Sequence, residues 1–321
     1  MLISLVIATL NEAKNISSLW GRLQEVAGSM PQHTLETLFV DDGSTDETVS
    51  LIRKLPVTTS LHWKLVKLSR NFGHQAAVSG GMFHCNGNVV VFLDADLQDP
   101  PELIPKFLEK FNEGYDVVYG VRKNRKESLW LKLCFAGFYK IYNLMAEQPI
   151  PADAGDFGLI SRKVIALLNS MPENDRLLRC MRSWVGFRQI GIPYDRPARH
   201  EGVSGYRLWR RIEGALDGLF GYSKLPIRFA ALIGLIVILT GFAYLAWVYC
   251  GWLFLGGQPV QGWISIVTLG FILAGANILV TAIVGEYACR IYFQAKTRPL
   301  FVVEDIYLPE TPDAPIFPLK T

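Results

Sequence analysis

The sequence predicts an α/β fold in which a mostly parallel β-sheet carries helices on its faces, followed by a two-helix hairpin of membrane-spanning length. Two observations predict the sheet. Short, apolar, β-branched runs end at clusters of polar residues, and segments with helical apolar spacing separate these runs. A third observation predicts the hairpin, because no Asp, Glu, Lys or Arg occurs between Phe229 and Gly285.

Three stretches are expected to be buried parallel strands, namely Ile3 to Thr9, Thr37 to Val40 and Asn88 to Leu93. Between them, the stretches Ile16 to Val26 and Thr48 to Leu55 have the apolar spacing of helices. In sheets of this kind, ligands bind beyond the carboxyl ends of the strands. We therefore expect a binding site where the polar clusters follow the strands.

The uncharged stretch is long enough for two spans, since one helix crosses the hydrocarbon core in roughly 20 residues. We expect these helices at Phe229 to Leu255 and Trp263 to Gly285, joined by a turn rich in Gly and Pro. Basic residues flank the outer ends of the pair and the turn has none, which predicts that both chain termini are cytoplasmic. These flanking residues are Lys224, Arg228, Arg290, Lys296 and Arg298.

These features divide the chain into three parts. Residues 1–223 form a cytoplasmic domain, residues 224–298 form the transmembrane hairpin, and residues 299–321 form a cytoplasmic tail. The Pro-rich end of this tail, after Tyr307, is expected to be loosely ordered. The first ten residues lack a basic region ahead of their apolar run, so we expect a strand there and not a signal peptide.

Composition and motif content exclude several classes of protein. A formal net charge of +3 is too small to indicate nucleic-acid binding, which requires a clustered basic face. The five cysteines have no CxxC spacing, so neither a zinc site nor a disulfide framework is indicated. The sequence also lacks the glycine-rich dinucleotide and P-loop motifs. Those motifs bind phosphate groups through backbone N–H groups. Without them, a diphosphate ligand must be held by a metal ion and by cationic side chains.

The third strand ends in a candidate metal site formed by Asp94, Asp96 and Gln98. Carboxylate and amide oxygens suit Mg²⁺ or Mn²⁺, which keep open positions for phosphate oxygens. A lone Asp-x-Asp turn is also frequent as a solvated loop. The metal interpretation gains support because the other two strands also end in acids, at Asn11-Glu12 and at the turn Asp41 to Asp46. Within that turn, Ser44 or Thr45 is expected to cap a helix.

Five ordered motifs resemble the family 2 glycosyltransferases of GT-A fold. They are Ile7 to Glu12, Asp41 to Asp46, Arg70 to His74, Asp94 to Pro101 and Gly155 to Phe157. Together with the C-terminal hairpin, they make the chain similar to the polyprenyl-phosphate branch of that family, such as the bactoprenol glucosyltransferases and dolichol-phosphate mannose synthases. The resemblance covers the sequence from Leu2 to about Arg298. It implies a GT-A nucleotide-sugar-binding domain in residues 1–223.

The resemblance assigns roles to individual residues at the donor site. It implies that Glu12 and Asp42 hold the base and ribose of a nucleotide sugar and that Arg70 and Asn71 line the nucleotide pocket. The metal is then held by Asp96, with Gln98 and Asp94 close by. The adjoining residues of the same motifs complete the nucleotide-sugar set, and these are Ala8, Leu10 and Ala95 together with Asp94.

The resemblance places Asp156 beside the anomeric carbon, as a general base or as an electrostatic stabiliser. A lipid phosphate is largely ionised near pH 7, since its second pKa is about 6, so it needs little deprotonation. The local sequence also permits a second interpretation. In that interpretation, Asp156 caps a helix that runs from Ile160 to Leu168.

Cationic residues are expected to bind the acceptor. Arg122 and Arg125 are candidates for binding a lipid phosphate through charge-assisted hydrogen bonds. The basic segment in which they lie can equally attach the protein to the membrane surface by electrostatic attraction. Amphipathic segments near 128–146 and 205–223 are expected to lie in the membrane interface. The segment around His200 to Arg207 resembles the loop that closes over the donor pyrophosphate in the family, but it has Gly205 in place of the usual Lys. Arg199, Ser204 and Arg207 are therefore the candidates for binding the pyrophosphate.

The resemblance implies inverting transfer of a sugar, by default glucose from a UDP-linked donor, to undecaprenyl phosphate. The reaction is expected on the cytoplasmic face of a bacterial inner membrane, in a multi-pass protein that uses Mg²⁺ or Mn²⁺. Expected partners are the nucleotide sugar, the polyprenyl phosphate, the lipid bilayer, and a downstream flippase and transferase, with homo-oligomerisation left open. The alternatives are a processive polysaccharide synthase, whose Gln-x-x-Arg-Trp signature is missing, and a non-catalytic nucleotide-sugar sensor.

Overall fold

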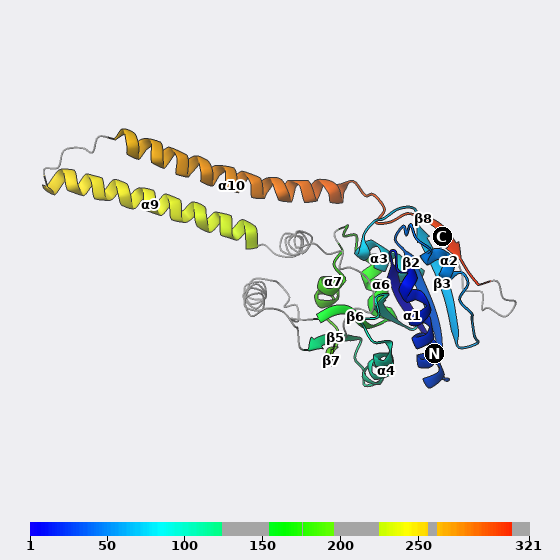
Figure 1. Ribbon diagram of the computed structural model, residues 1–321. Helices are drawn as coiled ribbons and strands as arrows, with labels where there is room; N and C mark the ends of the chain where they lie inside the picture. Colours follow the sequence, from blue (N-terminus) through cyan, green and yellow to red (C-terminus); the bar gives the residue numbers. More distant parts are fainter. Residues whose placement is uncertain (124–153, 175, 196–224, 256–261, 310–321) are drawn as a thin grey trace. The chain divides into compact units, whose positions relative to one another are not determined.

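The computed structural model describes residues 1–321 except 124–153, 175, 196–224, 256–261 and 310–321. The chain divides into two compact units. The first comprises Met1–Tyr139, Gln148–Arg207 and Arg298–Thr321, and the second comprises Lys140–Glu147 and Leu208–Thr297. The first unit contains the sheet with its helices, and the second contains the two long helices (Figure 1).

One eight-stranded sheet organises the first unit, with the strand order β7-β5-β6-β4-β1-β2-β3-β8. Strands β4, β1, β2 and β3 are parallel, and so are β5 and β7. Strand β6 runs antiparallel to both β4 and β5, and β8 runs antiparallel to β3. The bounds are β1 Leu2–Thr9, β2 Thr34–Asp41, β3 Leu61–Leu68, β4 Val89–Asp94, β5 Val117–Lys123, β6 Ala154–Ser161, β7 Gln189–Asp195 and β8 Val303–Tyr307.

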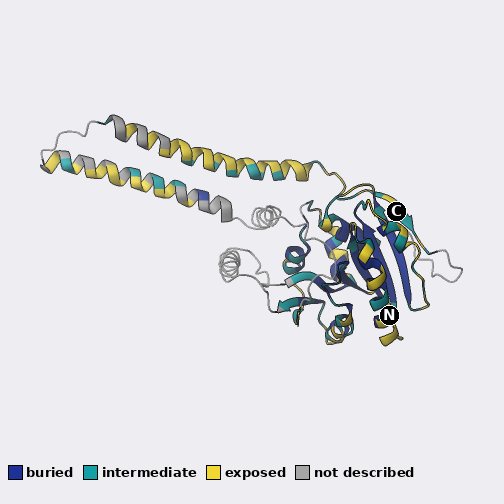
Figure 2. Ribbon diagram, viewed as in Figure 1, coloured by how far each residue is buried: buried dark blue, intermediate teal, exposed yellow. Residues whose placement is uncertain are grey.

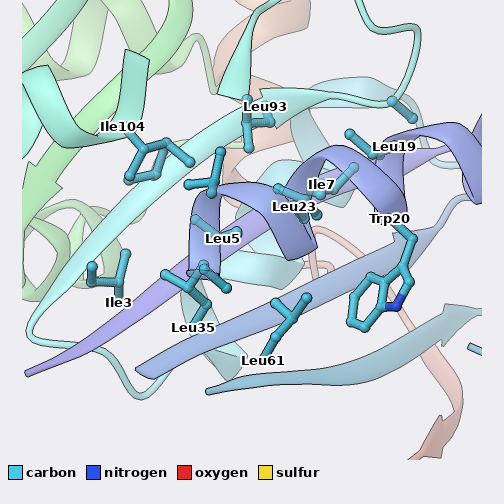
Figure 3. Packing of buried hydrophobic residues seen from close by; sticks show 14 of the residues in the cluster. Ile3, Leu5, Ile7, Leu19, Trp20, Leu23, Leu35, Leu61, Leu93 and Ile104 are labelled. Carbon is cyan, nitrogen blue, oxygen red and sulfur yellow. The ribbon is translucent and has the colours of Figure 1, made fainter. Parts of the chain in front are cut away.

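Helices cover the sheet, and alternating side chains of the strands fill the space beneath them. In β1, Ile3, Leu5 and Ile7 are fully buried among residues of α1, including Leu19 and Leu23 (Figure 3). On the other face, Val6 contacts Gly81 of α3 so closely that a Cβ there has no room. The helices are α1 Ala13–Ser29, α2 Thr48–Ile52, α3 His74–His84, α4 Ile104–Asn112, α6 Arg162–Ser170 and α7 Leu178–Trp184, with a 3₁₀ turn η1 at Pro101–Leu103.

The predicted fold class is confirmed, since the sheet is mostly parallel and helices flank it. The three predicted strands are β1, β2 and β4. Strand β1 begins one residue earlier than expected, β2 begins three residues earlier and ends one residue later, and β4 is shifted by one residue toward the C-terminus. Strands β3 and β5 to β8 were not predicted. The predicted helix from Thr48 to Leu55 is shorter, because α2 ends at Ile52.

The second unit contains α9 (Leu225–Leu255) and α10 (Trp263–Ala295), which pack against each other. Their apolar side chains are largely exposed, such as Leu239, Ile272 and Ile278 (Figure 2). By length and composition, Ile272–Ala295 is a candidate membrane span among the described residues. Helix α10 continues beyond the predicted end at Gly285, and its extension holds the ion pair between Arg290 and Glu286 at 2.9 Å.

The segment expected to be a tail includes a strand of the sheet. Residues Val303–Tyr307 form β8, which pairs with β3 at the sheet edge. Lys67 of β3 forms an ion pair with Glu304 at 2.8 Å, and Phe301 packs against the buried cluster that contains Val40. The segment predicted as a tail thus contributes an edge strand, which was not predicted, before the Pro-rich end after Tyr307. The sequence signal is weak there because a five-residue edge strand buries few side chains.

Candidate active site

The acids that follow β1, β2 and β4 lie side by side at the carboxyl edge of the sheet. In the parallel register, Ala8 of β1 lies opposite Asp94 of β4, and Thr9 lies opposite Asp41 of β2. Strand β6 brings a fourth acid to the same edge. Gly158 of β6 lies opposite Phe92 of β4, and because the strands are antiparallel, Asp156 lies two residues farther toward the end of β4.

The loops after β1 and β2 are interlocked by short hydrogen bonds. Asn11, which adopts a φ of 56°, donates its backbone N–H to Ser44 Oγ at 2.9 Å and accepts from Thr45 N at 2.8 Å. Gly43 has a φ of 79°, and a Cβ there would lie 2.8 Å from the backbone nitrogen of Asn71. Only glycine meets both conditions at this position. The turn therefore has a fixed shape that also supports the Arg70–His74 loop.

Asp42 anchors the loop that follows β3. Its side chain is 3% exposed, and its carboxylate oxygens accept hydrogen bonds from the backbone N–H groups of Phe72 at 2.7 Å and Gly73 at 3.0 Å. Burial raises the pKa of Asp42, and these two hydrogen bonds oppose the rise. The Arg70 guanidinium lies over the Phe72 ring, 3.9 Å from its centroid. The structure thus places Asp42 against the loop that carries Arg70 and Asn71.

Asp46, and not Ser44 or Thr45, joins the starts of α1 and α2. Its Oδ1 accepts from the Thr48 N–H at 3.0 Å and from the Thr48 hydroxyl at 2.6 Å, and its Oδ2 accepts from Ala13 N at 3.2 Å. Burial alone would raise the pKa of Asp46, but the hydrogen bonds from Thr48 and Ala13 lower it overall. The expected cap by Ser44 or Thr45 is wrong, because Asn11 engages both residues. Glu12 lies in the same network, with its backbone N–H bonded to Thr48 Oγ1 at 2.9 Å.

The Asp94–Gln98 turn contains the candidate metal ligands. Asp96 is 9% exposed, and its Oδ1 accepts from the backbone N–H of Gln98 at 3.1 Å. Asp94 Oδ1 lies 3.9 Å from Nε2 of His74, the first residue of α3. Among the described residues, no group of three His, Cys, Asp or Glu side chains surrounds one point. This donor set fits an ion such as Mg²⁺ or Mn²⁺, which takes few protein oxygens and keeps positions for phosphate and water.

Asp156 lies within β6, which shows that the helix-cap interpretation is wrong. Helix α6 begins at Arg162, with Ser161 as its N-cap residue. The side chain of Asp156 is half-buried and accepts a hydrogen bond from Gln75 Nε2 at 2.7 Å through Oδ2. The Gln75 amide also accepts from the backbone N–H of Leu178 at 2.9 Å. Gln75 therefore links Asp156 to α3 and α7.

Arg122 lies on β5 beside the strand that carries Asp156. A Cβ on Gly155 would lie 3.0 Å from Arg122 Nη2, so the guanidinium contacts the backbone next to Asp156. The hydroxyl of Tyr194 on β7 interacts with Arg122 and donates to Asp99 Oδ1 at 2.6 Å. Burial would lower the pKa of Arg122, but Tyr194 and the nearby carboxylates of Asp99 and Asp94 raise it above its ordinary value. The arginine is a fixed positive charge at the sheet edge.

Several residues that contact the predicted site residues were not predicted from sequence. Gln75 and Tyr194 carry no motif of their own, while His74 and Asp99 lie inside recognised motifs without an assigned role. Their contacts join distant strands and helices, which sequence spacing does not reveal. The remaining predicted site residues lie outside the described residues, namely Arg125, Arg199, Ser204 and Arg207, and so do both predicted interfacial helices, 128–146 and 205–223.

The acidic edge lies beyond the carboxyl ends of the parallel strands, which is where sheets of this kind bind their ligands, and β6 and β5 add one further carboxylate and a cation to it. The family model for glycosyl transferase family 2 matches residues 4–168. The chain belongs to this family, has its GT-A-like fold and is a glycosyltransferase.

Two curated relatives align over nearly the whole chain. A glycosyltransferase of Synechocystis sp. that has no assigned substrate is 38% identical over 306 residues, covering 95% of this chain and 95% of the relative. The bactoprenol glucosyl transferase of Shigella phage SfV is 35% identical over 306 residues, covering 95% of this chain and 99% of the relative. A mannosyltransferase from Pyrobaculum calidifontis, solved with GDP-Man and Mn²⁺, is 18% identical with a TM-score of 0.45, covering 87% of this chain and 86% of that one.

Proposed function

We propose that this protein transfers a hexose, by default glucose from UDP-glucose, to a polyprenyl phosphate such as undecaprenyl phosphate, with inversion at the anomeric carbon. The observation that carries the proposal is the convergence of acids and a cation at one sheet edge. Asp94 ends β4, Asp156 lies near the start of the adjacent antiparallel strand β6, and Arg122 contacts Gly155, the residue before Asp156. The 35% identity to a bactoprenol glucosyl transferase over nearly the full length supports the same acceptor.

The donor is assigned to the loops after β1, β2, β3 and β4. Asp42, with Glu12 and the Arg70–Asn71 pair, is proposed to bind the base and ribose, bordered by the strand-end residues Ala8, Leu10 and Ala95. Asp96, Gln98 and Asp94 would hold Mg²⁺ or Mn²⁺. When bound, this ion supplies positive charge that neutralises the diphosphate and the leaving group.

The acceptor is assigned to Arg122 and Asp156. An oxygen of the lipid phosphate forms a bond to the anomeric carbon from the face opposite the diphosphate, and the bond from that carbon to the diphosphate oxygen breaks. The nucleoside diphosphate leaves with the electron pair. Arg122 positions the phosphate through charge-assisted hydrogen bonds. Asp156 stabilises the positive charge that develops on the sugar ring, because an ionised phosphate needs no general base.

The cellular setting follows from the apolar helices. Helices α9 and α10 are proposed to anchor the enzyme as a multi-pass protein in a bacterial inner membrane, with both termini cytoplasmic, as the basic flanks at Lys224, Arg228 and Arg298 favour. The product, a polyprenyl-phosphate sugar, would carry its sugar on the cytoplasmic leaflet. A flippase and a second transferase are therefore proposed to act downstream.

Transfer of radiolabelled sugar into an organic-extractable lipid tests the proposal. The purified full-length protein is incubated with undecaprenyl phosphate, Mg²⁺ or Mn²⁺ and a panel of labelled nucleotide sugars. We expect one donor to label the lipid phase and chelation of the metal to abolish labelling. The Asp96→Ala variant is expected to be inactive, whereas Glu109→Ala, which removes an exposed carboxylate on α4, is expected to match the wild type. Undiminished transfer by Asp96→Ala contradicts the metal assignment.

A further inference from the structure

Arg182 is the largest fully buried side chain of the described protein. It lies on α7 and is 1% exposed. The guanidinium of arginine keeps its positive charge in proteins at physiological pH. A charge removed from water without compensation is strongly destabilising. The fold must therefore provide a negative group that balances Arg182.

Among the described residues, the hydrogen bond and the ring contact of the Arg182 side chain are both with neutral groups. Its Nη1 donates to the backbone carbonyl of Gly155 at 3.0 Å, and its guanidinium lies over the Tyr119 ring, 4.4 Å from the centroid. Within the described part of the chain, its Nε and Nη2 atoms are buried and have no hydrogen-bond partner. These contacts fix the position of the guanidinium, but they do not balance its charge.

Asp156 supplies the negative charge. Its backbone follows directly on Gly155, whose carbonyl Arg182 binds. Burial lowers the pKa of Arg182, and Asp156 is the strongest of the groups that oppose this change; Tyr119 and Cys180 act in the same direction and Arg179 in the opposite one. Asp156 Oδ1 is also buried with no hydrogen-bond partner among the described residues. The two charges interact without a direct hydrogen bond between them.

A second link joins Asp156 to the same helix. Gln75 donates to Asp156 Oδ2 at 2.7 Å and accepts at 2.9 Å from the backbone N–H of Leu178, the first residue of α7. Helix α7 is thus connected to the Asp156 segment at two points. Its first residue, Leu178, is connected through Gln75, and its fifth residue, Arg182, binds the carbonyl of Gly155 directly. These contacts restrain both the carboxylate and the backbone that carries it.

We propose that Arg182 is the buried counter-charge of Asp156 and that, with Gln75, it is a positioning residue that keeps this carboxylate oriented. The catalytic consequence rests on the proposed function, in which Asp156 acts on the sugar ring. The competing interpretation is a purely structural pin between α7 and β6. In that case, removal of Arg182 would change stability without any dependence on the charge of Asp156.

A double-mutant cycle on thermal stability separates the two interpretations without any substrate. Melting temperatures of the full-length protein in detergent are measured for the wild type, Asp156→Asn, Arg182→Met and the double variant. If Asp156 is the counter-charge, Asp156→Asn is strongly destabilising while Arg182 is present, because the buried positive charge loses its negative partner. The same substitution is much less destabilising in the Arg182→Met background, where no buried charge remains to be balanced. We expect the decrease in melting temperature caused by Asp156→Asn to differ between the wild-type and Arg182→Met backgrounds by at least about 2–4 °C.

A structural pin instead predicts additive losses, and additivity within error overturns the proposal. The matched control is the same cycle with Glu109→Gln, an exposed carboxylate on α4, in place of Asp156→Asn. That control cycle is expected to be additive. Because no step of the cycle requires turnover, its outcome stands even if the proposed sugar transfer proves wrong.

A comparison of kcat with KM provides the catalytic test. Arg182→Met is expected to lower kcat for sugar transfer roughly tenfold or more while the KM for the nucleotide sugar stays within about twofold, because the carboxylate of Asp156 loses its orientation. Arg182→Lys keeps the positive charge and is expected to restore most of the kcat. An active Arg182→Met protein with the wild-type kcat contradicts the proposal.

Discussion

The two sides of the candidate site are built in different ways. The proposed donor side comprises residues 10–13, 41–48, 70–74 and 94–99. It consists of short loops at the ends of parallel strands, held by hydrogen bonds between backbone and nearby side chains. The proposed acceptor side comprises Arg122, Asp156, Arg182 and Tyr194, and it is held by side chains that reach across several elements. The comparison suggests that variants on the two sides should affect different kinetic constants.

The largest expected effect is that of Asp156→Asn on turnover. Loss of the carboxylate charge is expected to lower kcat roughly 10²- to 10³-fold, because charge developing in the transition state is no longer stabilised. The apparent affinity for the nucleotide sugar should stay within about twofold, since no described contact joins Asp156 to the Asp42 loop. Steady-state transfer assays and equilibrium binding of the nucleotide sugar measure the two quantities, with Glu109→Gln as control. A parallel loss of donor affinity would break the proposed division of the site.

On the donor side, Asp42→Asn is expected to weaken nucleotide-sugar binding roughly tenfold to a hundredfold. The amide can offer only one acceptor oxygen, so one of the buried N–H groups of Phe72 and Gly73 loses its partner and the Arg70–His74 loop shifts. Titration calorimetry measures the affinity, and kcat at saturating donor should fall less than it does in Asp156→Asn.

The pH dependence of donor binding sharpens this prediction. The pKa of Asp42 is raised by burial above its ordinary 3.8, so protonation begins at a higher pH than for an exposed aspartate. A protonated Asp42 has no negative charge to strengthen its hydrogen bonds from Phe72 and Gly73. The affinity of the wild-type protein for the nucleotide sugar should therefore decline as the pH falls toward the raised pKa of Asp42. The Asp42→Asn variant should lack this component of the decline. Identical pH profiles for the two proteins would argue against Asp42 as the titrating group.

The difference between the two sides also explains what could be predicted from sequence. The donor residues lie in contiguous motifs at the ends of apolar strand runs, so Asp42, Asp94 and Asp96 could be assigned before the fold was known. The role of Asp42 in anchoring the 70–74 loop could not be predicted from sequence, because this role depends on β2 and β3 being neighbours in the sheet.

On the acceptor side, sequence motifs selected isolated residues but did not reveal their connections. Asp156 and Arg122 were selected, but no strand was predicted at β6, and the second interpretation of Asp156 placed a helix from Ile160 onward, where β6 still continues to Ser161. The antiparallel insertion of β6 between β4 and β5 brings together residues more than thirty positions apart. Gln75, Arg182 and Tyr194 act only in that context, and no local pattern marks them.

A smaller effect on the acceptor side is expected from Tyr194→Phe. The variant removes the hydroxyl between Asp99 and Arg122 but keeps the ring, whose centroid lies 5.4 Å from that of Phe157. One lost hydrogen bond of this kind should raise the KM for the lipid phosphate roughly twofold to tenfold and leave donor affinity unchanged. The control is Tyr115→Phe, since the Tyr115 ring contacts Arg188 and not Arg122. An effect confined to the donor would place Tyr194 on the other side of the comparison.

The smallest expected effect concerns the outer support of the donor side, where Arg22 of α1 binds Glu102 of the η1 turn. Two short bonds join them, Nε to Oε1 at 2.7 Å and Nη2 to Oε2 at 2.6 Å, but the side chains are 29% and 50% exposed. An exposed pair of this kind contributes at most about 1 kcal/mol. Burial would raise the pKa of Glu102, yet the bonds from Arg22 lower it overall below 4.5.

The lowered pKa fixes the direction of the pH dependence. The stabilisation is fully present above the pKa of the unfolded chain and is lost as the pH falls through the lower pKa of the folded protein. Glu102→Gln should therefore lower the melting temperature slightly at pH 7, and the difference from the wild type should shrink in acid. Thermal unfolding at a series of pH values measures it. A difference that grows in acid would mean that the ion pair is not what stabilises this corner of the donor side.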